Sequence, residues 1–160
     1  MKKKEVIKII KMINILLIIL WMAVVFAFSN EKGDKSTNTS RKVTNVVLET
    51  VTASKPEEKT IDQVDKVIRK IAHYTLYTIG GILIISYAYT TEKNNKTKIL
   101  YSIAFGAGYA MTDEIHQFFV SKRNASIIDV GIDTLGIITG IILYLIIRKF
   151  IIWLKEKHKS

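Results

Sequence analysis

Apolar residues along this chain are gathered into four long runs that polar segments separate. The runs cover residues 12–28, 71–89, 99–120 and 127–147. A helix needs about 20 apolar residues to cross the ~30 Å hydrocarbon core of a bilayer. Lipid leaves no water for unpaired backbone groups, so only helices and closed barrels span it. The pattern therefore predicts an all-α integral membrane protein with four transmembrane helices.

The first run has two interpretations. Lysines precede it and Val25-Phe26-Ala27 resembles a processing site, as in a cleaved signal peptide. Its apolar stretch is longer than the ~7 to 15 residues that are usual in such peptides, which favours a retained span. Both interpretations place residue 29 onward outside the cytoplasm, so the predicted orientation does not depend on the choice.

Residues 29–70 are too long for a simple connection, so we expect them to contain structure. Four valines fall on one helical stripe and predict an amphipathic segment, namely Val43, Val46, Val47 and Val51. Thr60 and Gln63 have the spacing of a capping box, from which a helix would continue into the second span. The chain is thus predicted to be a single membrane domain, residues 1–160, with a short helical extracytoplasmic segment between the first and second spans.

Basic residues give the chain an orientation. Lys+Arg 24 against Asp+Glu 14 leaves a net charge of +10. The N-terminus, the loop 90–98 and the tail from Arg148 hold 13 basic and 3 acidic residues, whereas the remainder holds 11 of each sign. The positive-inside rule therefore predicts a multi-pass cell-membrane protein with both termini cytoplasmic and the loops 29–70 and 121–126 outside. Because topology accounts for the charge, no nucleic acid partner is predicted.

Several ionisable residues lie inside the predicted spans, where each costs roughly 2.5 to 3.5 kcal/mol. We counted residues from the cytoplasmic ends of three spans at ~1.5 Å per residue. One level, about 22 Å from the inner interface, then holds Tyr77, Asp113 and Asp133. A second level, one turn further out, holds His73, Gln117 and Asp129. On each helix the two residues are spaced i, i+4 and share a face, which predicts one polar cluster in the outer leaflet.

Cationic neighbours extend this cluster into a candidate pocket. Arg69 and Lys70 lie beyond His73, and Arg123 lies in the short outer turn near Glu114. The candidate pocket consists of Arg69, Lys70, His73, Tyr77, Asp113, Glu114, His116, Gln117, Arg123, Asp129 and Asp133. An ion-pair network that only holds the helices in register is the alternative, although apolar residues can often replace buried ion pairs without loss of stability.

Small residues occur at the spacing that allows helices to approach closely. Gly136 and Gly140 form a GxxxG pattern, and Ala104 with Gly108 forms its small-residue analogue. We therefore expect helix packing at both pairs.

The polar residues resemble a known family in type, spacing and order. The segments RKIAHYTLYTIGGIL (69–83) and DEIHQFFVSKRNASIIDVGIDTLGIITG (113–140), with FSNEKGDKS after the first span, are similar to motifs of the VanZ-like family of bacterial membrane proteins. The family's pattern carries over to every pocket residue except Asp133, and also to Phe119, Gly136 and Gly140. The chain departs from the pattern at Leu76, Lys122 and Asp133, where glutamate, glycine and asparagine respectively are common. The resemblance implies a four-helix membrane protein, associated through the family's namesake with reduced susceptibility to the glycopeptide antibiotic teicoplanin.

Two classes of function fit the candidate pocket. An envelope-associated binding or protection protein would hold the headgroup of a membrane lipid, a lipid-linked molecule or a glycopeptide-like ligand between Arg69, Lys70 and Arg123. An intramembrane acid–base or metal-assisted enzyme acting on a lipid-linked substrate would instead use His73 or Glu114 as a base and another carboxylate as an acid or metal ligand. Transport is the third class: four helices without an inverted repeat do not favour a lone transporter, which leaves an oligomeric pore as the alternative.

Metal binding receives little support from the sequence. The chain has no cysteine, which excludes disulfides and thiolate metal sites. A divalent metal held by Asp113, Glu114, His116 and Asp129 is an alternative, but no recognised ligand spacing such as HExxH is present. No metal and no cofactor is therefore predicted.

Overall fold

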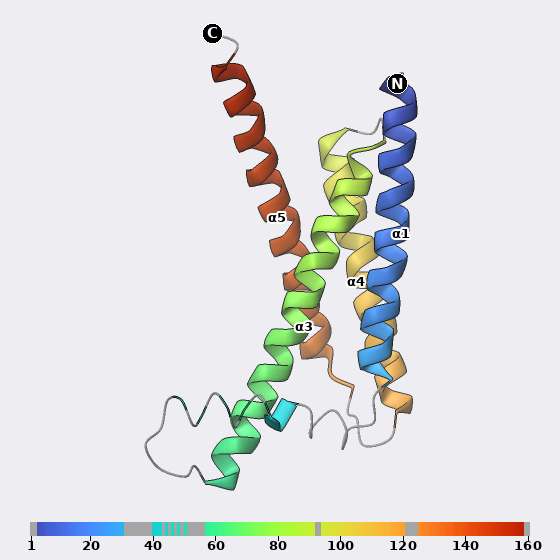
Figure 1. The fold of residues 1–160 in the computed structure, drawn as a ribbon. Helices are drawn as coiled ribbons and strands as arrows, with labels where there is room; N and C mark the ends of the chain where they lie inside the picture. Colours follow the sequence, from blue (N-terminus) through green and yellow to red (C-terminus); the bar gives the residue numbers. More distant parts are fainter. Residues whose placement is uncertain are drawn as a thin grey trace.

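The computed structural model describes residues 3–30, 40–42, 44, 46, 48, 50, 57–91, 94–120 and 125–158. Figure 1 shows its four long helices, which are α1 (Lys3–Ser29), α3 (Glu58–Ala88), α4 (Asn95–Phe119) and α5 (Ile127–Lys157). These ranges contain no strand, which confirms the predicted all-α fold class. The described residues between 40 and 50 have helical backbone. Three valines of the predicted amphipathic stripe lie outside the described residues, namely Val43, Val47 and Val51.

Side-chain caps explain where α4 and α5 begin. Asn94 accepts a hydrogen bond from the Thr97 amide at 2.8 Å through its side-chain oxygen. Ser126 Oγ accepts one from the Ile128 amide at 3.2 Å. Such caps satisfy backbone donors that the first turn of a helix leaves unpaired.

The start of α3 differs from the prediction. The helix begins at Glu58, and the Thr60 amide already donates to the Glu57 carbonyl oxygen at 2.9 Å. Thr60 therefore lies inside the first turn and cannot be the N-cap, so the capping-box prediction is wrong. The acidic side chains of Glu57 and Glu58 favour this earlier start, because the N-terminus of a helix carries a partial positive charge.

α3 is the central helix of the bundle and packs against α1, α4 and α5. The indole Nε1 of Trp21 in α1 donates to the Leu76 carbonyl oxygen in α3 at 2.9 Å. The Tyr109 hydroxyl of α4 donates to the Met22 carbonyl oxygen of α1 at 2.7 Å. The apolar core lies at these contacts and consists of Trp21, Val25, Tyr77, Ile84, Ile85, Ala110, Ile137 and Ile141.

Glycines allow α3 and α5 to cross at close range. A Cβ atom added to Gly140 would lie 2.0 Å from the Thr78 carbonyl oxygen, and one added to Gly136 would lie 2.6 Å from the Tyr74 carbonyl oxygen. Only hydrogen fits at these positions. Beyond the crossing, α5 diverges from the other helices toward the C-terminus (Figure 1).

Ala104 and Gly108 do not make the predicted helix contact within the described part of the chain. Both are exposed on α4, and a Cβ added to Gly108 would meet no described atom within 4 Å. Gly106 packs against α5 instead, since its added Cβ would lie 2.7 Å from the Ile137 side chain. Residues two positions apart on a helix differ by about 200° in direction. Residues 104 and 108 are each two positions from residue 106, so they point away from the face that holds it.

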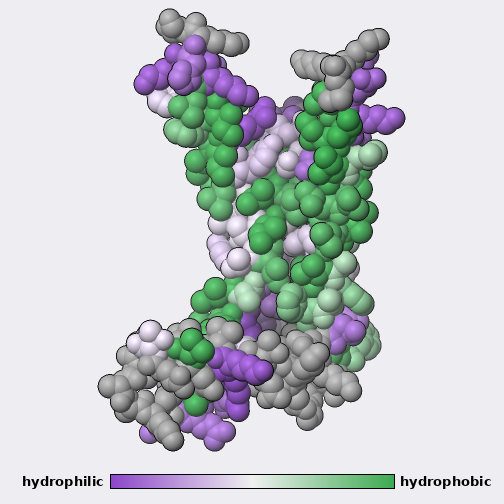
Figure 2. All heavy atoms as spheres, viewed as in Figure 1, coloured by the Kyte–Doolittle hydropathy of each residue, from purple (hydrophilic) through white to green (hydrophobic). Residues whose placement is uncertain are grey.

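The surface of the molecule suits a membrane. Three segments are long and apolar enough to cross one, namely Lys4–Ser29, Glu58–Ala88 and Ile127–Lys157. Figure 2 shows hydrophobic residues covering the middle of the molecule, with hydrophilic residues toward both ends. Large apolar side chains such as Leu16, Phe105 and Ile146 are exposed there. An apolar surface of this kind marks contact with lipid or another protein instead of water, and the chain is an integral membrane protein.

Candidate functional site

The predicted polar cluster forms where α3, α4 and α5 meet near one end of the bundle. His73 comes from α3, Asp113 from α4 and Asp133 from α5, and one ligand-capable atom of each lies within 4.8 Å of the other two. We call these three residues the His–Asp–Asp group. Helix packing therefore brings together residues from both predicted levels of the cluster.

Asp133 is the most buried member of the group. Its side chain is 1% exposed, and its Oδ2 lies 3.6 Å from His73 Nδ1. That separation is too long for a hydrogen bond, so the contact is an ion pair when the imidazole carries a proton. Oδ2 has no hydrogen-bond partner among the described residues.

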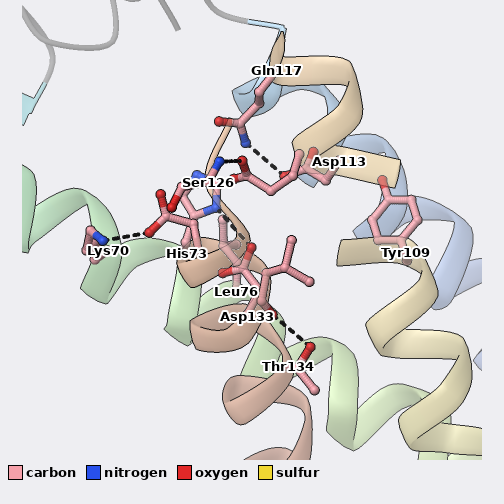
Figure 3. A network of polar contacts seen from close by, with 12 residues as sticks. Lys70, His73, Leu76, Tyr109, Asp113, Gln117, Ser126, Asp133 and Thr134 are labelled. Carbon is pink, nitrogen blue, oxygen red and sulfur yellow. Dashed lines mark hydrogen bonds and ion pairs between the residues drawn. The ribbon is translucent and has the colours of Figure 1, made fainter. Parts of the chain in front are cut away.

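Asp113 is buried beside an amide and a phenol. Gln117, one turn along α4, donates to Asp113 Oδ2 at 3.0 Å (Figure 3). Tyr77 is fully buried, and its hydroxyl has no hydrogen-bond partner among the described residues. This hydroxyl lies close enough to Asp113 and Asp133 to interact electrostatically with both.

Glu114 has a backbone partner instead of the predicted cation. Its Oε2 accepts a hydrogen bond from the Ser126 amide at 2.8 Å. Ser126 is the N-cap of α5, so the carboxylate faces the partly positive end of that helix. Glu114 therefore joins α4 to α5. Arg123, the cation predicted beside it, lies outside the described residues.

The predicted cationic edge consists of side chains with acidic neighbours. Lys70 Nζ lies 2.6 Å from Asp129 Oδ1, and the two side chains are 47% and 32% exposed. Arg69 lies 3.4 Å from Asp65, one turn earlier on α3. Asp65 is buried, and sequence reasoning missed it, although its i, i+4 spacing to Arg69 was a usable signal.

His116 contacts a residue outside the polar cluster. Its ring lies on Phe26 of α1, with 4.6 Å between ring centroids. The alternative metal set of Asp113, Glu114, His116 and Asp129 is therefore not brought together as a group. Among the described residues, the carboxylate and imidazole atoms that converge belong to His73, Asp113 and Asp133.

The fold and the cluster define a class of protein: a helical membrane protein with a polar site buried between its helices. The family model described as VanZ/LLP1 matches residues 14–148, which include every residue of the candidate pocket. The chain belongs to this family, as its resemblance to the VanZ-like pattern predicts. Comparison with curated proteins and with solved structures gave no match.

Proposed function

We propose that this VanZ/LLP1 family member is an envelope-associated binding protein that crosses the membrane four times and holds a polar headgroup at the candidate pocket. α4 is the proposed fourth span, because its 25 residues extend over about 37 Å alongside α3 and α5. Its residues Asp113, Glu114 and Gln117 are buried in the bundle and not turned toward lipid, as is usual for polar groups at membrane depth. The distribution of basic residues supports cytoplasmic termini and a pocket in the outer leaflet.

The contact between Lys70 and Asp129 carries the proposal. Both side chains are partly exposed, and one turn further into the bundle lies the His–Asp–Asp group. A bound headgroup can replace the ion pair by contacts of its own. Its phosphate or carboxylate would accept from Lys70, and its hydroxyl or amine groups would donate to Asp129. An exposed ion pair contributes only about 0 to 1 kcal/mol, so separating it for a ligand costs little.

A lipid-linked or glycopeptide-like envelope molecule fits this arrangement. Its polar part would lie at the Lys70–Asp129 contact, while an attached hydrocarbon chain would lie against exposed apolar residues such as Ile71 and Ile127. Membership of the family supports the glycopeptide association, and we include reduced teicoplanin susceptibility in the proposed function.

The test compares teicoplanin susceptibility in a host that expresses the wild-type chain or single variants. Lys70→Ala and Asp129→Asn should return susceptibility to that of the empty host, because each removes a group that contacts the headgroup. Lys66→Ala is the matched control: Lys66 lies one turn before Lys70 on α3 and is exposed. It should keep the wild-type susceptibility.

Membrane abundance and thermal stability, measured in parallel, separate binding from scaffolding. Inactive Lys70 and Asp129 variants with wild-type abundance and melting temperature would support a pocket. The proposal fails if the wild-type chain leaves susceptibility unchanged, or if every inactive variant is also unstable, since the cluster would then serve only to hold the helices together.

A further inference from the structure

The His–Asp–Asp group has the composition of a metal site. We propose that His73, Asp113 and Asp133 bind one divalent transition-metal ion, with zinc bound more tightly than manganese. Each ligand comes from a different helix, and their ligand-capable atoms lie within 4.8 Å of one another. This inference goes beyond the proposed function and does not depend on it.

The donor atoms indicate which ions fit. Imidazole nitrogen suits zinc, copper, iron and nickel, whereas carboxylate oxygen suits magnesium, calcium and manganese. A set of one nitrogen and two oxygens lies between these groups, and affinity rises from manganese to zinc for a given site. Zinc lies about 2.0 to 2.2 Å from such atoms and is tetrahedral in most protein sites, so two of its ligands lie about 3.3 to 3.6 Å apart. His73 Nδ1 and Asp133 Oδ2, at 3.6 Å, already have this separation, and side-chain rotation would bring Asp113 onto the same ion.

Two buried oxygen atoms at this place have no hydrogen-bond partner among the described residues: Asp133 Oδ2 and Tyr77 Oη. Leaving a buried polar atom unpaired is unfavourable, and such atoms call for a bound ion or water. A metal ion would bond directly to the Asp133 carboxylate. The Tyr77 hydroxyl, which is fully buried beside Asp113 and Asp133, could then donate to a ligand carboxylate or to water on the ion.

The charges of the group also favour a cation. Asp113 and Asp133 are 4% and 1% exposed, and buried charges in proteins are paired or coordinate metal ions. Gln117 gives Asp113 a hydrogen bond but no charge. A protonated His73 brings one positive charge, at 3.6 Å from Asp133. A divalent ion would balance both carboxylates and leave the imidazole neutral, which is the form that binds metal.

The group is also accessible. The His73 side chain is 20% exposed, and the Lys70–Asp129 contact lies one turn further out on α3 and α5. Three protein ligands leave at least one coordination position for water or for an oxygen atom of a bound molecule. The site is therefore of the open kind and is not closed by a fourth protein ligand.

Metal content and thermal stability test the proposal. The full chain would be purified in detergent through a tag that lacks histidine, and its metals measured by mass spectrometry before and after a chelator. We expect one zinc ion per chain on reloading, with a melting temperature that rises with zinc concentration, because an ion that binds only the folded chain stabilises it. Manganese should give a smaller rise at the same concentration.

Variants locate the ion. Asp133→Asn and His73→Gln should each weaken zinc binding by about 10-fold or more, on the scale of losses seen when metal sites are altered. His116→Gln is the matched control, because His116 lies on the same α4 helix as Asp113 but contacts Phe26. This variant should bind zinc as the wild type does.

X-ray absorption at the zinc edge of the wild-type chain completes the test and does not depend on whether a variant folds. One imidazole with oxygen ligands would support the site. Two or more imidazoles, unchanged zinc binding by both variants, or no saturable zinc binding by the wild type would each overturn it. Because no readout involves teicoplanin, failure of the metal site and failure of the proposed function are distinguishable.

Discussion

At the scale of single residues, two aspartates one turn apart on α5 have different surroundings. Asp129 is partly exposed and lies 2.6 Å from Lys70. Asp133 is buried, and His73 is its charged contact within the described part of the chain. Asp129 therefore forms a weak, partly solvated ion pair, whereas Asp133, one turn later, is a buried carboxylate whose charge His73 compensates only in part.

Asp133→Asn should stabilise the metal-free chain. The amide keeps the shape of the side chain and removes a carboxylate that is 1% exposed, and burying an incompletely paired charge is unfavourable. A gain of about 1 kcal/mol raises the melting temperature of a chain of this length by roughly 2 to 4 °C. Thermal melts in detergent with a chelator present would measure it.

Asp129→Asn provides the comparison in the same experiment. It should lower stability by less than about 1 kcal/mol, because its contact with Lys70 is partly solvated. A destabilising Asp133→Asn together with a stabilising Asp129→Asn would show that the charged position has been assigned to the wrong aspartate.

Helix spacing on its own predicts many of the residues in this cluster, but it does not predict which of them form hydrogen bonds or ion pairs with each other. Counting along three spans places Asp113 and Asp133 at one depth and His73 one turn further out, and the structure brings all three together. The partner of Glu114 was not predictable, because the backbone amide of Ser126 becomes available only where α5 begins. Side-chain type and spacing describe which residues converge, whereas rotamers and helix ends decide which of them bond.

At the scale of helices, the crossing of α3 and α5 is the contact that positions the cluster. Gly136 and Gly140 bring the α5 backbone against Tyr74 and Thr78 of α3. His73 and Asp133 lie within one turn of this crossing. Any displacement of α5 at these glycines would separate their side chains.

Gly140→Ala adds only one methyl group but should destabilise the chain strongly. The added methyl group would lie 2.0 Å from the Thr78 carbonyl oxygen, which belongs to backbone and cannot rotate away. Overpacking of this kind costs about 1 to 3 kcal/mol. The melting temperature in detergent should fall, and zinc binding should weaken with it.

Gly108→Ala is the control for that substitution. Its methyl group would meet no described atom within 4 Å, and alanine is a better helix former than glycine by about 1 kcal/mol. This variant should be as stable as the wild type or more stable. A Gly140→Ala chain that melts like Gly108→Ala would contradict the close crossing.

The two small-residue pairs show what a sequence pattern leaves open in a membrane protein. Gly136–Gly140 and Ala104–Gly108 have the same spacing, yet the second pair is exposed. Lipid is as apolar as a helix interface, so hydropathy does not distinguish the lipid-facing side of a helix from the packed side. Trp21 illustrates the same limit, because it is buried in the core, where its indole Nε1 donates to the Leu76 carbonyl oxygen.

At the scale of the whole molecule, orientation determines which side of the membrane reaches the pocket. Both chain ends lie at the same end of the bundle (Figure 1). The candidate pocket uses the last turns of α4 and the first turns of α5, which lie toward the other end. If the lysine-rich ends are cytoplasmic, the pocket is accessible from outside.

Single cysteines should report this orientation directly, because the chain has no cysteine of its own. On whole cells, a membrane-impermeant thiol reagent should label Asn38→Cys and leave Asn94→Cys unlabelled. Ile79→Cys, on the apolar surface of α3, is the control and should remain unlabelled in intact and opened cells. External labelling of Asn94→Cys would reverse the orientation and move the pocket to the cytoplasmic side.

Because α5 diverges from the other helices, its residues should differ in how well they tolerate substitution. Ile146 and Ile147, and then each residue from Phe150 to Trp153, are apolar and exposed, so these side chains do not pack against the other described helices. At these positions one apolar side chain can replace another, whereas at the α3 crossing even a methyl group is excluded. Neutral variation should therefore accumulate at these exposed positions, while Gly136 and Gly140 tolerate almost none, although all of them belong to one helix.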